Sequence, residues 1–133
     1  MSTSATDKKV IAITGASSGI GEETAKQLVN NGYNVALLAR SEDKLRALVE
    51  ELGNDNAFAV KADVSDFNEL DKAFKKVSEH FGRIDGIFAN AGRGAKAAGI
   101  EKGDVDDWDG MLGANVNGLL YTAKAGLPYL RDT

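Results

Sequence analysis

The stretch Thr14-Gly15-Ala16-Ser17-Ser18-Gly19-Ile20-Gly21 joins a short apolar run to the first helical pattern of the chain. The apolar run, Val10–Thr14, is nearly continuous in hydrophobic residues, which is typical of a strand buried on both faces of a parallel sheet. The pattern that follows, residues 19–31, predicts a helix that ends before Gly32. A strand, a glycine-rich turn and a helix in this order favour a loop that binds phosphate groups.

Each glycine of this loop has its own geometric use. Gly15 allows a sharp turn, Gly19 lets the backbone approach a pyrophosphate, and Gly21 lets the helix pack closely against the strand. Amide groups at the helix N-terminus attract negative phosphates, and the serine hydroxyls can donate further hydrogen bonds. The residues predicted to hold the pyrophosphate of a dinucleotide are Gly15, Ser17, Ser18, Gly19, Ile20 and Gly21. The alternative is a turn in which the glycines serve backbone geometry alone.

Apolar runs and helical patterns alternate along the rest of the chain. The later apolar runs cover residues 33–39, 57–62 and 84–89, and the later helical patterns cover residues 41–52, 65–81 and 105–130. Ser41 and Ser65 stand where helix N-caps belong, and glycines within the last pattern predict a bend there. This alternation predicts an α/β fold, a Rossmann-type doubly wound parallel sheet. The predicted strand order is 3-2-1-4, truncated before the later strands of such a sheet.

Composition narrows the chemistry that we expect of the chain. It has 133 residues, 16 basic and 20 acidic side chains, no cysteine and a single histidine, His80. Disulfides, thiolate nucleophiles and Cys-type or multi-His metal sites are therefore excluded, and we predict no metal. The net charge of −4 argues against nucleic acid as the main partner, because its phosphates would be repelled. We find no membrane-length apolar stretch and no apolar signal-peptide core, so we expect no membrane partner and a cytoplasmic location.

The end of the second predicted strand bears on the choice of cofactor. A site specific for NAD carries an acidic residue here, which accepts hydrogen bonds from the ribose hydroxyls. Ala39 offers no such acceptor, whereas the guanidinium of Arg40 suits a 2′-phosphate and Ser41 can donate a further hydrogen bond. We therefore predict NADP as the cofactor and regard NAD as less favoured. The alternative is a solvated arginine at a strand end.

Three further motifs complete a resemblance to the short-chain dehydrogenase/reductase family. The glycine loop matches that family's cofactor motif residue for residue. Asp63-Val64 resembles the family's adenine-contacting pair, and Asn90-Ala91-Gly92 resembles its Asn-Ala-Gly motif after the fourth strand. The resemblance implies that Asp63 and Val64 contact adenine, and that Asn90, Ala91 and Gly92 line the crevice at the strand ends. From the residues alone, Asp63 can also cap the next helix, and Asn90 can tie neighbouring backbone segments together.

Asn115, on the long last helix, resembles the asparagine of the family's catalytic tetrad. In the family that residue helps to hold a water molecule connected to the active-site lysine; read alone, it is a structural hydrogen-bonding residue. The other catalytic residues of the family, a serine and a Tyr-x-x-x-Lys pair, do not occur in these 133 residues. Tyr121 and Lys124 are one residue too close to form that pair, so Tyr121 is interpreted as a packing residue.

The resemblance implies a whole protein that is an NADP(H)-dependent oxidoreductase acting on a small-molecule alcohol or carbonyl substrate. We expect residues 1–7 to be a flexible N-terminus and residues 8–133 to form one NAD(P)-binding Rossmann domain, inactive alone. The alternative is a non-catalytic dinucleotide-binding or regulatory module. We also expect a homo-oligomer through the long helix that contains Asn115, because that helix and the edge of the fourth strand lack cover.

Overall fold

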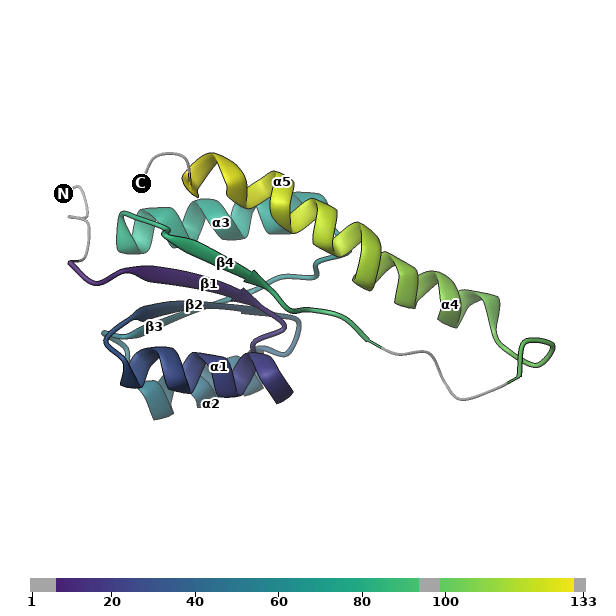
Figure 1. Cartoon of the computed structure of the whole chain (residues 1–133), viewed down its shortest axis with the longest axis horizontal. Helices are drawn as coiled ribbons and strands as arrows, with labels where there is room; N and C mark the ends of the chain where they lie inside the picture. Colours follow the sequence, from purple (N-terminus) through teal and green to yellow (C-terminus); the bar gives the residue numbers. More distant parts are fainter. Residues whose placement is uncertain (1–6, 94–98, 131–133) are drawn as a thin grey trace.

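In the computed structural model, which describes residues 7–93 and 99–130, a four-stranded sheet lies between two layers of helices (Figure 1). The strands are β1 (Val10–Thr14), β2 (Asn34–Ala39), β3 (Ala57–Lys61) and β4 (Gly86–Ala89). The helices are α1 (Gly19–Asn30), α2 (Glu42–Leu52), α3 (Phe67–Phe81), α4 (Val105–Leu112) and α5 (Gly118–Leu130), with a π-helical turn, η1 (Gly113–Asn117), between the last two. The predicted flexible N-terminus lies outside the described residues, apart from Asp7.

The strands are all parallel and their order is β3-β2-β1-β4, which confirms the predicted sheet. Ile13 in β1 stands opposite Leu37 of β2 on one side and Phe88 of β4 on the other. The chain therefore moves outward from β1 to β3 and then returns to the opposite side of β1. In open α/β sheets, ligands bind at such a reversal, outside the carboxyl ends of the strands.

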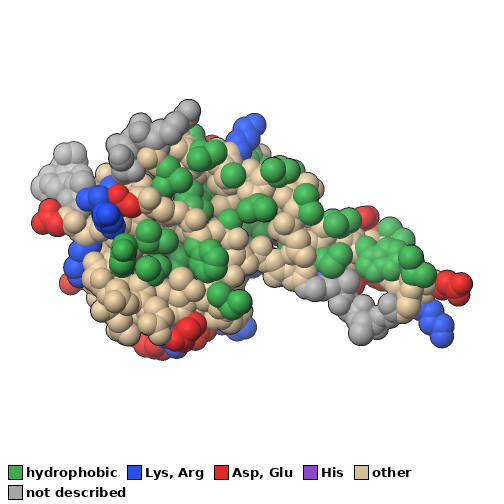
Figure 2. Space-filling view, viewed as in Figure 1, with side chains coloured by type: hydrophobic (Ala, Val, Ile, Leu, Met, Phe, Trp, Pro, Cys, Tyr) green, Lys and Arg blue, Asp and Glu red, His purple; other side chains and the backbone are tan. Residues whose placement is uncertain are grey.

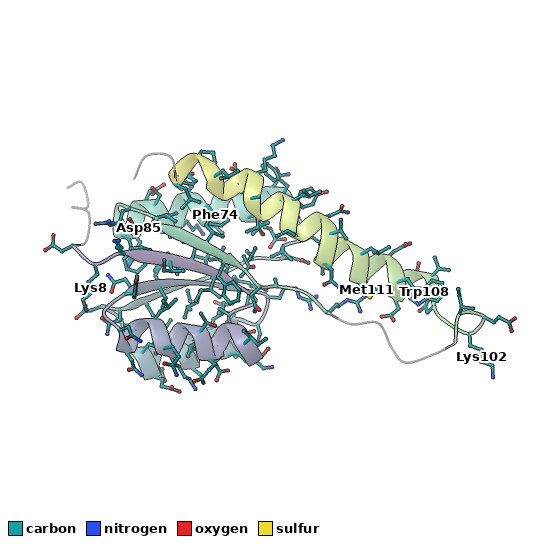
Figure 3. The ribbon with its side chains drawn as sticks, viewed as in Figure 1. Lys8, Phe74, Asp85, Lys102, Trp108 and Met111 are labelled. Carbon is teal, nitrogen blue, oxygen red and sulfur yellow. The ribbon has the colours of Figure 1, made fainter. Side chains whose placement is uncertain are left out.

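Both faces of the sheet are buried, which accounts for the near-continuous apolar runs in the sequence. On one face, Val10 and Ala12 pack with Phe74 and Val77 of α3, and Figure 3 labels Phe74 between that helix and the sheet. On the other face, Ile13 and Leu37 of the sheet pack with residues of α1 and α2, including Ala25, Leu45 and Leu48. Each fully buried large aliphatic or aromatic side chain contributes about 1.5–3 kcal/mol relative to exposure.

The N-cap of α3 differs from the prediction. Ser65 was expected to cap this helix, and that expectation is wrong: Asp66 is the N-cap, and its Oδ1 accepts a hydrogen bond from the amide of Glu69 at 3.2 Å. The amide of Ser65 instead donates to Oδ1 of Asp63 at 2.9 Å, which places Ser65 in the preceding turn. Ser41 does occupy the N-cap of α2, but its side chain makes no capping hydrogen bond to the described residues.

The long helix predicted over residues 105–130 is interrupted where its glycines cluster. The π-helical turn η1 separates α4 from α5, and α4 extends away from the sheet as an arm (Figure 1). Figure 2 shows apolar side chains along this arm. Within residues 7–93 and 99–130, no helix combines the length and the apolar character that crossing a membrane requires.

Candidate functional site

A cleft of about 710 Å³ opens at the carboxyl ends of the strands. Segments that follow all four strands form its walls, together with Gly110 and Ala114 of the long helix. The predicted cofactor-binding residues that line it are Gly15, Ser17, Ser18, Ile20, Arg40, Ser41, Asp63, Val64, Asn90, Ala91 and Gly92. Residues predicted from separate motifs therefore meet in one place, as the strand order requires.

Hydrogen bonds hold the loop after β1 against the segment after β4. Oγ1 of Thr14 accepts hydrogen bonds from the amides of Asn90 at 3.0 Å and Ala91 at 3.1 Å. The side-chain amide of Asn90 donates in return to the carbonyl of Gly15 at 3.2 Å. Thr14 is 1% exposed, so these bonds form away from solvent. They fix the relative position of two cleft walls that are far apart in the sequence.

Two glycines of the loop, Gly15 and Gly21, are packed closely against neighbouring backbone. Gly15 has a φ of +66°, and a Cβ there would lie 2.8 Å from Cα of Ala91. Gly21 is buried and does not line the cleft; a Cβ there would overlap the carbonyl oxygen of Gly15 and lie 2.7 Å from Nδ2 of Asn90. Both positions thus require glycine because the chain packs too closely for a side chain.

Gly19 differs from the other two glycines because its surroundings are open. It has a φ of +58°, and a Cβ built there would have no described atom within 4 Å. The preceding Ser18 is the N-cap of α1, yet its side chain makes no capping bond to the described residues. The first turn of α1 therefore presents its amides beside open space. This geometry fits a ligand diphosphate, although Gly19 itself is not a lining residue of the cleft.

Two basic side chains stand where β2 ends. Arg40 is exposed and lines the cleft with Ser41. Lys44, the third residue of α2, lines the same cleft and was missed by the sequence analysis. The available signal was a second basic residue four positions after Arg40, on the helix that begins there. Among the described residues, neither Arg40 nor Lys44 is in an ion pair.

One oxygen of the Asp63 carboxylate accepts a hydrogen bond within its own turn. Oδ1 of Asp63 accepts from the amide of Ser65 at 2.9 Å, and the amide of Asp63 donates to Glu69 Oε1 at 3.3 Å. Asp63 and Val64 also line the cleft. The carboxylate thus has one oxygen in a local hydrogen bond, while Asp66 caps the following helix.

Asn115 acts on the segment after β4 through its side chain. Its Oδ1 accepts from the amide of Arg93 at 2.8 Å, and its Nδ2 donates to the carbonyl of the same residue at 2.8 Å. A Cβ at Gly92 would lie 2.6 Å from Asn115 Oδ1, so this clamp also depends on glycine. Asn115 is not among the described lining residues of the cleft. These contacts match the structural role left open for it from the sequence.

Arg93 adds a second attachment of this segment to the long helix. Its Nη1 lies 3.0 Å from Oδ1 of Asp107, and its Nη2 donates to the carbonyl of Asp107 at 2.9 Å. A Cβ at Gly110 would overlap the guanidinium of Arg93. Arg93 lines the cleft, although neither Arg93 nor Asp107 belongs to a recognisable sequence motif.

Another cavity, of about 430 Å³, lies beside the edge strand β3, and none of the predicted site residues lines it. His80, which stacks on Phe58 with ring centroids 4.0 Å apart, is one of its lining residues. Burial lowers the pKa of His80 below its ordinary value. The residues predicted from the motifs gather in the larger cleft, so the candidate site is there.

Comparison with known proteins gives matches over almost the whole chain. The family model described as short chain dehydrogenase matches residues 9–133. An oxidoreductase of Staphylococcus saprophyticus is 41% identical over 123 residues, which are 92% of this chain and 50% of that protein. An oxidoreductase of Botryotinia fuckeliana is 42% identical over 124 residues, which are 93% of this chain and 45% of that protein.

Solved structures share the same fold. An alcohol dehydrogenase from Thermococcus sibiricus, complexed with 5-hydroxy-NADP, matches with a TM-score of 0.88 and 38% identity over 96% of this chain and 55% of its own. A 3-ketoacyl-(acyl-carrier-protein) reductase from Brucella melitensis, complexed with NADH, matches with a TM-score of 0.89 and 33% identity over 93% of this chain and 51% of its own.

The chain spans about half the length of the curated relatives it matches. The family match, these identities and the sheet order confirm the resemblance that the motifs indicated. This chain belongs to the short-chain dehydrogenase family.

Proposed function

We propose that this chain is the cofactor-binding part of an NADP(H)-dependent oxidoreductase that acts on an alcohol or carbonyl substrate. The observation that carries the proposal is the cleft at the reversal of strand order, where the open first turn of α1 and the basic end of β2 occur together. Family membership and the oxidoreductase names of the relatives support the reaction class. When bound, the nicotinamide ring accepts hydride from an alcohol or donates it to a carbonyl.

The chain's own residues bind and orient the cofactor. The amides that open α1, with Ser17 and Ser18, hold the pyrophosphate, because backbone N–H groups and the helix dipole favour negative charge there. Gly15, Gly19 and Gly21 give the loop its shape, and Ile20 lines the cleft beside them. Asp63 and Val64 contact the adenine, and the residues that line the inner part of the crevice are Asn90, Ala91 and Gly92.

Arg40 and Ser41 select NADP over NAD in this proposal. The cleft wall at the end of β2 carries no carboxylate at Ala39 and a guanidinium at Arg40, which suits a 2′-phosphate. Among similar structures, one is complexed with 5-hydroxy-NADP and another with NADH.

Coenzyme titration of the full-length protein by nicotinamide fluorescence tests the preference. We expect NADPH to bind more tightly than NADH. Arg40→Ala should reduce the ratio of the two dissociation constants about tenfold, which corresponds to the loss of one charge-assisted hydrogen bond. Arg46→Ala is the matched control, because Arg46 lies on α2, the helix that follows Arg40, but pairs with Glu42 and lines the other cavity. Equal affinities for the two coenzymes before mutation would refute the NADP proposal.

The oxidoreductase proposal is tested in the whole protein. We expect a serine followed by Tyr-x-x-x-Lys in the sequence after Thr133, and NADPH oxidation with carbonyl substrates. In such an enzyme the backbone of Arg93, which the side chain of Asn115 binds, borders the active site. Absence of that serine and Tyr-x-x-x-Lys from the whole sequence, with tight NADPH binding retained, would favour a non-catalytic dinucleotide-binding module instead.

We further propose that the long helix mediates homo-oligomer formation. Several large apolar side chains of α4, η1 and α5 are at least half exposed, among them Leu112, Val116, Leu119, Leu120 and Leu127. Burial of such a surface favours association. Size-exclusion chromatography of the full-length protein should show an oligomer, and Leu119→Lys with Leu120→Lys should shift it toward the monomer. A clean monomer before mutation would contradict this proposal.

A further inference from the structure

We propose that Lys44 is a specificity-determining residue that contributes a second cation, beside Arg40, to the 2′-phosphate subsite. This inference rests on the proposed NADP function and deepens it. Lys44 was not selected by any motif of the sequence. The structure brings it to the same cleft wall as Ala39, Arg40 and Ser41.

The packing of α2 determines which way Lys44 faces. Leu45 and Leu48 are 1% and 5% exposed and hold one side of the helix against the sheet. Glu42, in the same first turn, lies 3.3 Å from the guanidinium of Arg46 and lines the cavity beside β3. Lys44 instead lines the large cleft. In the first turn of α2, the ammonium group of Lys44 therefore lies at the cleft, whereas Glu42 pairs with Arg46 beside the other cavity.

Arg40 and Lys44 differ from the basic side chains that form ion pairs within the described residues. Lys26 pairs with two glutamates, and Arg46, Arg83 and Arg93 each pair with a carboxylate within 3.3 Å. Within the described part of the chain, Arg40 and Lys44 have no carboxylate within 4.0 Å. An anionic ligand in this cleft would therefore face two positive side chains that no carboxylate of the described residues pairs with.

The charge of a phosphate monoester explains why one cation is not sufficient. Such a group carries between one and two negative charges near neutral pH. Arg40 offers a planar fork of donors, and Lys44 adds a flexible point charge. The glycine-loop wall supplies only the neutral hydroxyls of Ser17 and Ser18. In this proposal, Lys44 therefore supplies the second positive charge beside a 2′-phosphate.

Titrations of the full-length protein with NADPH and NADH test the role of Lys44. We expect Lys44→Ala to raise the dissociation constant of NADPH about tenfold and to leave that of NADH within about twofold. Lys44→Arg should keep most of the NADPH affinity, because the charge remains. The matched control is Lys76→Ala, which removes an exposed lysine from α3, outside the cleft. The Lys44→Ala effect should shrink as salt is raised, since these charges are exposed.

The outcomes separate this inference from the proposal on which it rests. If the unmutated protein binds the two coenzymes equally, the NADP proposal itself fails. If it prefers NADPH and Arg40→Ala reduces that preference, but Lys44→Ala does not, only the Lys44 inference is overturned. Equal weakening of NADPH and NADH binding by Lys44→Ala also overturns it, because the lysine would then act on the shared part of the coenzymes. A selective loss for NADPH, rescued by Lys44→Arg, supports it.

Discussion

Thr14 shows how much of the site depends on one buried hydroxyl. Its Oγ1 accepts hydrogen bonds from two consecutive amides of the segment after β4. The side chain is 1% exposed, so water cannot replace the hydroxyl if it is lost. Thr14 ends β1, and the glycine loop starts at the next residue. A single side chain therefore joins the two segments between which the cleft opens.

We predict that Thr14→Val lowers the free energy of unfolding by about 2 kcal/mol, because two buried amides lose their acceptor while the side-chain volume hardly changes. Thr122→Val is the control: Thr122 is also 1% exposed, but its hydroxyl donates to the carbonyl of Gly118 within α5. Its loss should cost under about 1 kcal/mol, because that carbonyl can still accept the helical hydrogen bond. Urea unfolding measures both values; equal losses would contradict the role given to Thr14.

Among the structural elements, α4 is attached to the segment after β4 by a small number of specific contacts. It extends away from the sheet, and Figure 3 labels Trp108 and Met111 on it, far from Phe74 in the core. Arg93 joins this helix to the segment after β4 through two hydrogen bonds to Asp107. Gly110 leaves the space that the guanidinium of Arg93 occupies. Glycine has a low intrinsic helix propensity, but Gly110 is required in α4 because the side chain of Arg93 occupies the space beside it.

Alanine substitutions at two glycines test this account of α4. Gly113→Ala should raise the free energy of unfolding by about 0.5–1 kcal/mol, because its backbone is helical and the nearest atom to a new Cβ would be Ser65 Oγ at 3.9 Å. Gly110→Ala should give no such gain, because its Cβ displaces Arg93 from Asp107. In an Arg93→Ala background, Gly110→Ala should become stabilising. If Gly110→Ala raised the free energy of unfolding by the same amount with Arg93 present, the ion pair between Arg93 and Asp107 would contribute nothing to stability.

At the scale of the whole molecule, Asp85 ties the start of β1 to the residues that lead into the edge strand β4, at the end of the sheet opposite the cleft. Arg83 donates to both carboxylate oxygens at 2.7 and 2.8 Å, and the amide of Val10, which opens β1, donates to Oδ2 at 2.8 Å. Figure 3 labels Asp85 at the far side of the sheet from α4. The hydrogen bonds from Arg83, and then that from Val10, hold the pKa of Asp85 below its ordinary value of 3.8.

This depressed pKa predicts how stability depends on pH. Folding favours the charged form of Asp85, so the stabilisation is complete above the ordinary aspartate pKa of 3.8 and is lost as the pH falls through the lower folded pKa. Asp85→Asn should therefore lower Tm by a few degrees at pH 7 and make little difference near pH 2. Asp55→Asn, which removes the same charge at an exposed turn, should lower Tm much less at pH 7. A pH-independent loss from Asp85→Asn would mean that the charge is not responsible.

Much of the fold, and many of the residues that line the cleft, were predictable from local sequence patterns. The four apolar runs gave the strands to within two residues, because a strand buried on both faces reads as a continuous hydrophobic run. The glycine loop, Arg40 and the Asn90–Gly92 segment were predictable as cleft residues because parallel strands end at one edge. Lys44 and Arg93 were not, because no motif marks them and only the packing of α2 and α4 turns them toward the cleft.

The order of apolar runs and glycines in this chain is sufficient to specify a parallel α/β sheet with a phosphate-type loop, since strand burial, helix ends and turns are properties of short segments. The contacts that make the cleft a single site depend on the packed molecule instead. Thr14 and Asn90 are 76 residues apart, and Arg93 and Asn115 are 22 apart. Such hydrogen bonds depend on side-chain directions that exist only once the sheet and its helices are assembled.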